Sequence, residues 1–154
     1  MIQESVDLTA LAREAVELTR TAHLDREIVA AVDDGLATRG DSAQLLRVVR
    51  NLLTNAAIHT DPAGLIRLDA RRYPGTIVIS VSDDGPGMRP DQAQHAFERL
   101  WRADQSRVRK TGGTGLGLAI VQSTIAAHGG TVELRTDTDA GATVTLHLAP
   151  APHL

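Results

Sequence analysis

The sequence contains no cysteine among its 154 residues and only one Phe, one Trp and one Tyr. The absence of cysteine excludes a disulfide framework and thiolate metal sites, and it fits a reducing compartment. Because aromatic residues make up only 2% of the chain, a hydrophobic core has to be built from Leu, Val, Ile and Ala. Hydrophobic residues still amount to 42%, so a folded core is expected.

Net positive charge and long apolar runs are also missing. The formal net charge is −3 and the pI is about 6.0, which argues against a broad nucleic-acid surface. No apolar run approaches the roughly 18 residues of a membrane-spanning helix. The start, MIQESVDLTAL, lacks the basic and apolar regions of a signal peptide. We therefore expect one soluble domain covering residues 1–154.

Hydrophobic periodicity predicts two amphipathic helices in the first part of the chain. The first follows Asp7, which is placed to act as its N-cap. The second follows a turn in "TRG", begins at a cap formed by Asp41 or Ser42, and ends near Thr60. The apolar stripe of the first contains Leu8, Leu11, Ala12, Ala15, Val16 and Leu18, and that of the second Leu45, Leu46, Val48, Val49, Leu52, Leu53 and Ala56.

The remaining segments predict strands and a third helix. "REIVAAVDD" is typical of a strand, "LIRLDARRY" and "TIVISVSDDG" of a hairpin turning at Pro74-Gly75, and "TVELRTD" and "ATVTLHLAP" of a second strand pair. Thr114 is expected to cap a helix over 115–127, and a short helical piece is expected around 90–101. This order predicts an α+β fold with helices layered on a mixed or antiparallel sheet.

A glycine-rich loop precedes the third helix. In "KTGGTGLGLAI", Lys110–Ile120, four glycines fall within six residues. Such a loop lets backbone N–H groups approach a phosphate at a helix N-terminus. It is not a P-loop, because Lys110 comes before the glycines, and its spacing does not fit G-x-G-x-x-G. The alternative is a plain glycine-rich connector.

Polar residues interrupt the second helix at regular spacing. Asn51, Asn55 and His59 stand at i, i+4 and i+8, so they share one face. Asn is a mediocre helix former, and two of them beside an apolar stripe need a reason. One reason is a solvated polar face. The other is coordination of a cation that a ligand brings, since neutral amides bind bare Mg²⁺ poorly.

An acidic and glycine-rich segment, "VSDDGPGM", ends the first hairpin. A carboxylate at Asp83 can accept a hydrogen bond from the exocyclic amine of adenine, whereas guanine presents an acceptor there. Gly85 and Gly87 allow the backbone to come close to a flat base. The alternative is an ordinary acidic turn.

The segment "FERLWRADQSRVRK" is locally basic and holds the only Phe and Trp. It favours either a lid whose cations reach phosphates or an exposed charged loop. The six histidines stand in no zinc-binding spacing and are expected to be ordinary surface residues. The cations of the segment are Arg99, Arg102, Arg107, Arg109 and Lys110.

Taken together, these motifs resemble the catalytic and ATP-binding domain of bacterial sensor histidine kinases, in the superfamily shared with gyrase B, MutL and the heat-shock chaperone ATPases. The resemblance covers residues 6–150. It implies a two-layer α/β sandwich of the Bergerat type with a flexible lid over Mg·ATP. The matching segments are the Asn51/Asn55 helix (N box), "DDGPG" (first glycine box), "FERLWR" (F box), "GTGLGLAIV" (second glycine box), Gly141 with Thr143 (closing box), and "HGGT" at 128–131 (turn after the lid helix).

The resemblance also implies roles for single residues. Asn55 would ligate the Mg²⁺ that arrives with ATP, and Asn51 would assist at the phosphates. Asp83 would bind the adenine amine, and Gly85 and Gly87 would make room for the ring. Arg102 and Lys110 would reach the γ-phosphate and count, with the two asparagines, as catalytic. The remaining nucleotide-binding residues would be His59, Gly113, Thr114, Gly115, Leu116, Gly117, Leu118 and Thr143.

Two departures qualify the resemblance. Ile58 stands where the family often has Lys or Arg, so a phosphate contact is missing or is supplied by the lid. No histidine is followed by an acid, so the phosphoacceptor is expected on a separate dimerisation domain, with any sensor also absent. The expected partners are that domain and a response regulator, with no nucleic acid. The domain would be monomeric and cytoplasmic, in a membrane-anchored parent.

The leading hypothesis is therefore a protein-histidine kinase domain that positions ATP for transfer to a partner histidine. A second is an ATP-hydrolysing switch of the gyrase or chaperone type. Those enzymes carry a Glu base where Asn51 stands, so weak hydrolysis is expected here. A third is a nucleotide-binding regulatory module without transfer activity.

Overall fold

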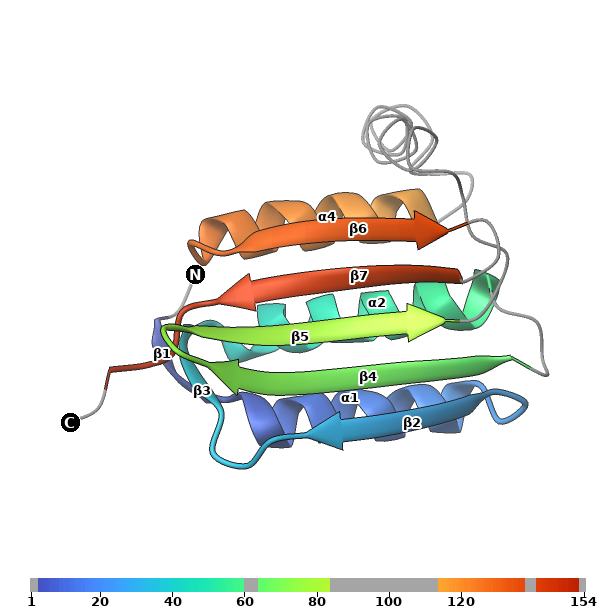
Figure 1. The fold of residues 1–154 in the computed structure, drawn as a ribbon, viewed down its shortest axis with the longest axis horizontal. Coiled ribbons are helices and arrows are strands. Elements are labelled where there is room, and N and C mark those ends of the chain that lie inside the picture. Colours follow the sequence, from blue (N-terminus) through green and yellow to red (C-terminus); the bar gives the residue numbers. More distant parts are fainter. Residues whose placement is uncertain (1–2, 60–63, 84–113, 138–140, 153–154) are drawn as a thin grey trace.

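The computed structural model describes residues 3–59, 64–83, 114–137 and 141–152, and it shows helices packed on one face of a β-sheet (Figure 1). The helices are α1 (Leu8–Ala22), α2 (Ser42–His59) and α4 (Thr114–Ala127). The strands are β1 (Glu4–Asp7), β2 (Glu27–Val32), β3 (Ala37–Gly40), β4 (Leu65–Tyr73), β5 (Thr76–Asp83), β6 (Thr131–Asp137) and β7 (Gly141–Leu148).

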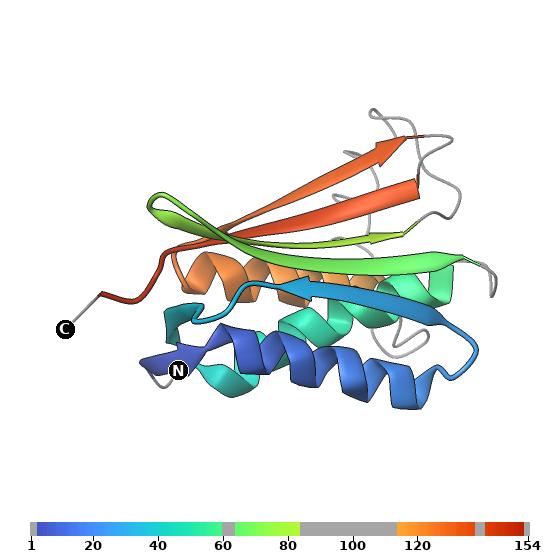
Figure 2. The ribbon, with the colours of Figure 1, turned by 60° about the horizontal axis from the view of Figure 1, so that its bottom comes forward.

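The main sheet has the strand order β2-β4-β5-β7-β6. The β2–β4 pair is parallel and the other pairs are antiparallel, so the sheet is mixed. Figure 2 shows the three helices on one side of this sheet, while no described helix covers the other side. The α+β sandwich predicted from the sequence is thus confirmed.

The core lies between the sheet and the helices. Strand alternation points Ile77, Ile79 and Val81 of β5 toward the helices, and all three are buried. The predicted stripe of α2 is buried, with Leu46 only partly so. The stripe of α1 differs at one position, because Leu18 is 38% exposed and Thr19 is buried instead.

The start of α2 differs from the expectation in one respect. The segment before it is not a turn, since Ala37–Gly40 forms β3 and pairs with β1 in a small antiparallel sheet. These strands have four residues each, which is too short for alternation to reveal them. The cap is Asp41, whose carboxylate accepts a hydrogen bond from the Gln44 N–H at 3.1 Å. At α1 the predicted cap is confirmed, because Asp7 accepts from the Ala10 N–H at 3.0 Å.

Thr9 holds α1 to the loop between β2 and β3. Its hydroxyl donates to the Asp33 carbonyl at 2.7 Å and accepts from the Leu36 N–H at 3.0 Å. Thr9 is only 6% exposed, so both hydrogen bonds are shielded from water. This loop therefore belongs to the rigid part of the fold.

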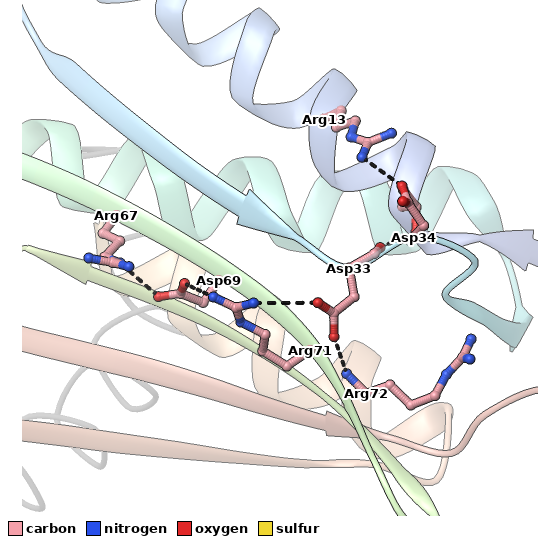
Figure 3. A network of polar contacts seen from close by, with 8 residues as sticks. Arg13, Asp33, Asp34, Arg67, Asp69, Arg71 and Arg72 are labelled. Atoms are coloured by element: carbon pink, nitrogen blue, oxygen red, sulfur yellow. Dashed lines mark hydrogen bonds and ion pairs between the residues drawn. The ribbon is translucent and has the colours of Figure 1, made fainter.

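A network of charged side chains closes the parallel strand pair where β2 and β4 end (Figure 3). The Asp33 carboxylate accepts from the Arg72 backbone N–H at 3.0 Å and lies 3.4 Å from the Arg71 guanidinium. Arg71 also lies 3.5 Å from the Asp69 carboxylate. These side chains are partly exposed, so each ion pair contributes little to stability.

The two ends of the sandwich differ in what they carry. The end of α2, the end of β5 and the start of α4 lie together at the right of Figure 1. Strand β1, the end of β7 and the turn between β4 and β5 lie at the left. No helix in the described part of the chain is long and apolar enough to cross a membrane.

Candidate functional site

The right-hand end of the sandwich collects most of the polar residues singled out from the sequence. Asn51 and Asn55 lie in the second half of α2, Asp83 ends β5, and Thr114 begins α4 (Figure 1). Helix α2 packs on both β5 and α4, so these three segments are neighbours in the fold. Residues that are far apart in the chain are thereby brought to one end of the structure.

The Asn55 side chain is the least satisfied polar group of this region. Its amide nitrogen Nδ2 is buried and has no hydrogen-bond partner. Among the described residues the same holds only for His147 Nε2, which lies 3.6 Å from a Glu133 carboxylate oxygen. Buried amide nitrogens normally donate a hydrogen bond, so this one is free to donate to an acceptor atom of a bound ligand. Asn51, one turn earlier, is half-buried.

Asp83 faces the same side of the sheet as the helices. It follows Val81 by two residues, and Val81 is 3% exposed in the core. Asp83 itself is half-buried and pairs in register with Ile66 of β4. Its carboxylate therefore lies on the helix side of the sheet, at the edge of the core.

Thr143 lies on the opposite face of the sheet, and its predicted nucleotide contact stays a prediction. In the register of β5 with β7, Thr143 is opposite Ser82 and Val144 is opposite Val81. Val144 packs against the core, so alternation places Thr143 on the bare face of the sheet.

Helix α4 runs from Thr114 to Ala127, so Thr114, predicted as the cap of a helix over 115–127, is its first residue. The turn that follows contains Gly129, with φ of 75°. Its first N–H groups have no partner within the helix and favour negative charge. Gly115, Leu116, Gly117 and Leu118 belong to this first part of α4, and His59 is the last residue of α2. Gly85, Gly87, Arg102, Lys110 and Gly113 lie outside the described residues.

His128 plays a structural role that the sequence did not reveal. Its Nδ1–H donates to the Thr124 carbonyl at 2.8 Å, because a carbonyl can only accept. The other ring nitrogen, Nε2, then accepts from the Asp41 N–H at 3.1 Å. The ring also lies against Gly40, where a methyl group would come within 2.3 Å of it. His128 thus joins the end of α4 to the start of α2.

Arg26 is the second residue that sequence reasoning missed. It lies in the loop between α1 and β2, and its Nε–H donates to the Ala57 carbonyl in the last turn of α2 at 2.8 Å. Its Nη1 also bonds to the Asp25 carboxylate at 2.7 Å. The side chain is only 14% exposed. No local motif marks an arginine of this kind, because its partner is 31 residues away.

The donor set fits a metal that arrives with a ligand. No group of three or more His, Cys, Asp or Glu in the described ranges is arranged to hold a metal ion. The amide oxygens of Asn51 and Asn55 are neutral, and Mg²⁺ prefers anionic oxygens. A cation already bound to phosphate oxygens and water can take a neutral ligand in addition, and the amide oxygen of Asn55 is a group of that kind.

Comparison with protein families and curated proteins gives consistent matches. Residues 40–152 match the family described as histidine kinase-, DNA gyrase B-, and HSP90-like ATPase. The chain is 34% identical to the sensor-like histidine kinase SenX3 of Mycolicibacterium smegmatis over 151 residues, which is 97% of this chain and 39% of SenX3. The chain therefore spans about two fifths of the length of that relative.

Solved structures give the same match. The mycobacterial sensor histidine kinase MprB superposes with a TM-score of 0.81 at 30% identity, covering 99% of this chain and all of that one. Full-length ShkA in complex with AMPPNP superposes with a TM-score of 0.81 at 30% identity, covering 99% of this chain and 32% of that one.

Proposed function

The chain belongs to the family of histidine kinase-, DNA gyrase B- and HSP90-like ATPases and corresponds to the catalytic domain of sensor histidine kinases; from this membership we propose that it binds Mg·ATP and transfers the γ-phosphoryl group to a histidine. The acceptor histidine would lie on a separate dimerisation domain, and a response regulator would receive the phosphoryl group next. SenX3 and full-length ShkA are much longer than this chain, so both partners are part of the proposal.

One observation supports the nucleotide site above the others. The buried, unpartnered amide nitrogen of Asn55, a donor that a phosphate oxygen could satisfy, stands on α2 at the same end of the sandwich as the end of β5 and the start of α4. A buried polar group without a partner costs roughly 1–3 kcal/mol, so it persists where a ligand offers compensation. Full-length ShkA, which this chain resembles over 99% of its length, was solved in complex with AMPPNP, and this supports nucleotide binding as the activity of the proposed site.

Each described residue then has a distinct task. Asp83 accepts a hydrogen bond from the adenine amine and so selects adenine over guanine. The first N–H groups of α4 hold phosphate oxygens. Asn55 would contribute its amide oxygen to the coordination of the metal, and Asn51 would assist in binding the phosphates. The Mg²⁺ brought by the nucleotide offsets phosphate charge, and phosphoryl transfer otherwise requires mainly positioning.

The residues in the undescribed segments complete the proposal. Gly85 and Gly87 would leave room for the base, and Arg102 and Lys110 would reach the γ-phosphate as cations of the lid. Gly112 and Gly113 would act as a hinge of that lid. We expect Gly115→Ala to weaken ATP binding more than Gly112→Ala; equal effects on affinity would contradict this division between phosphate binding and hinge.

The adenine contact is tested by calorimetry with Asp83→Asn. We expect ATP binding to weaken by about 1–3 kcal/mol, the usual cost of losing a hydrogen bond to a charged group. Asp69→Asn is the matched control, because Asp69 lies on β4 in the bare face of the sheet and pairs with Arg67. Unchanged affinity of the Asp83 variant, or an equal loss in both, would refute the role of Asp83.

The transfer activity is tested with a purified dimerisation hairpin and radiolabelled ATP. Label on the hairpin histidine is the expected result. Measurable ATP binding without any label would instead favour a regulatory binding module. The gyrase- or chaperone-type alternative is tested by ATPase turnover of the chain alone, where Asn51 in place of a Glu base predicts weak hydrolysis. Turnover near about one per second would argue against that reasoning.

A further inference from the structure

Asn55, the side chain of α2 that matters most for the proposed site, lies close to the C-terminal end of the helix. The last four carbonyl groups of a helix lack partners within it, and the last turn frays when they stay unsatisfied. Asn55 is four residues before His59, the end of α2. Its amide therefore stands in the part of the helix that is held least well by the helix itself.

Arg26 supplies the missing partner. Its Nε–H bonds to the carbonyl of Ala57, two residues after Asn55, at 2.8 Å. Its positive charge stands at a helix C-terminus, where it interacts favourably with the helix dipole. The neighbouring Leu24 is 88% exposed, so the loop lies on the surface, yet the Arg26 side chain is folded back and 14% exposed.

The burial of Arg26 is itself informative. A long cationic side chain loses conformational freedom and hydration when it is buried, so it needs good partners. Arg26 has two, the Ala57 carbonyl and the Asp25 carboxylate, and its backbone N–H is bonded to the His23 carbonyl at 3.0 Å. The loop thus connects the end of α1 to the end of α2 through hydrogen bonds of Arg26.

From this arrangement we infer that Arg26 is a positioning residue: it holds the last turn of α2 so that the Asn55 amide meets the metal of a bound nucleotide. The inference rests on the proposed nucleotide site. A ligating group has to be held within about 0.5 Å of its productive position. Arg26 should therefore affect the metal-dependent part of nucleotide affinity and have little effect on the part that does not require metal.

The test compares ATP affinity in excess MgCl₂ with ATP affinity in EDTA, and the ratio of the two dissociation constants is the magnesium increment. We expect Arg26→Met to reduce this increment about tenfold, as expected for losing a hydrogen bond from a charged donor. Arg26→Lys, which keeps the charge at the helix end, should restore part of it. In an Asn55→Ala background, Arg26→Met should change the increment no further.

Arg20→Met is the matched control. Arg20 also lies near the end of α1 and donates to a backbone carbonyl, that of Ile28 in β2, at 2.6 Å. That contact does not reach α2, so this variant should keep the full magnesium increment. Urea unfolding of all variants shows whether each is folded under the binding conditions. If Arg26→Met is unfolded, Arg26→Lys takes its place in the comparison, and its magnesium increment should lie below that of the unaltered chain.

Three results would overturn the inference. A folded Arg26→Met variant that keeps its magnesium increment shows that Arg26 does not position Asn55. Equal losses for Arg26→Met and Arg20→Met show a general effect of destabilisation. If the unaltered chain binds ATP equally well with and without magnesium, or does not bind it, the proposed function fails together with the inference.

Discussion

Gly40 and His128 form a contact whose energy can be measured. A Cβ atom at position 40 would lie 2.3 Å from His128 Cδ2 and 2.6 Å from Nε2. Gly40→Ala should therefore destabilise the fold by about 1–3 kcal/mol, the usual cost of overpacking. His128→Ala should cost about 1–3 kcal/mol as well, because it leaves the Asp41 N–H without its acceptor.

The double variant gives the sharper prediction. When His128 is already Ala, the nearest remaining atom to a methyl group at position 40 is Leu45 Cδ1, at 3.3 Å. Gly40→Ala should then be close to neutral, since the alanine also restricts the unfolded chain. The destabilisation of the double variant should fall short of the sum of the two single destabilisations by about 1–3 kcal/mol. This is within the range seen for residues in direct contact.

Urea unfolding followed by far-ultraviolet circular dichroism measures these free energies, provided that the slope with urea stays constant across the four proteins. Additive costs would refute the reasoning, because they would mean that the ring and the glycine do not share the space. A stabilising Gly40→Ala in the unaltered chain would refute it equally.

Two further substitutions test the fold elsewhere. Gly130→Ala should destabilise by about 1–3 kcal/mol, because a Cβ there would lie 2.3 Å from the His147 carbonyl oxygen, which is backbone; thermal unfolding checks it, and an unchanged midpoint would contradict the contact. Thr9→Val keeps the shape but removes both hydrogen bonds of a buried hydroxyl, so a loss of about 1–3 kcal/mol is expected in urea. The control Thr21→Val, at an exposed hydroxyl, should stay within about 0.5 kcal/mol, and similar losses for both variants would argue against the proposed role of Thr9.

The long elements could be predicted because their patterns repeat. The stripe of α2 continues over 18 residues, and the hairpin of β4 and β5 carries both its alternation and its turn, where Gly75 has φ of 74°. The strands β1 and β3 were missed because four residues give too few repeats to show a period. They form because each supplies the hydrogen-bond partners of the other.

The site could be predicted in part for a related reason. Asn51, Asn55 and Asp83 stand on long elements, so their placement follows once the elements are known. Thr143 also stands on a strand, yet its face depends on register with β5, and the motif does not encode that register. Arg26 and His128 act through backbone groups 31 and 87 residues away, and only the folded chain brings these together.

The separation between the two ends of the sandwich sets a condition on any acceptor joined to this domain. Helix α2 runs from one end to the other, and its 18 residues span about 27 Å at roughly 1.5 Å per residue. Asn55 lies 13 residues, about 20 Å, along the helix from Ser42, so a connecting segment attached beside β1 would need about six extended residues merely to reach level with Asn55. Under the proposed function, an acceptor histidine attached there would therefore have to reach along about 20 Å of the sandwich, or belong to a second molecule.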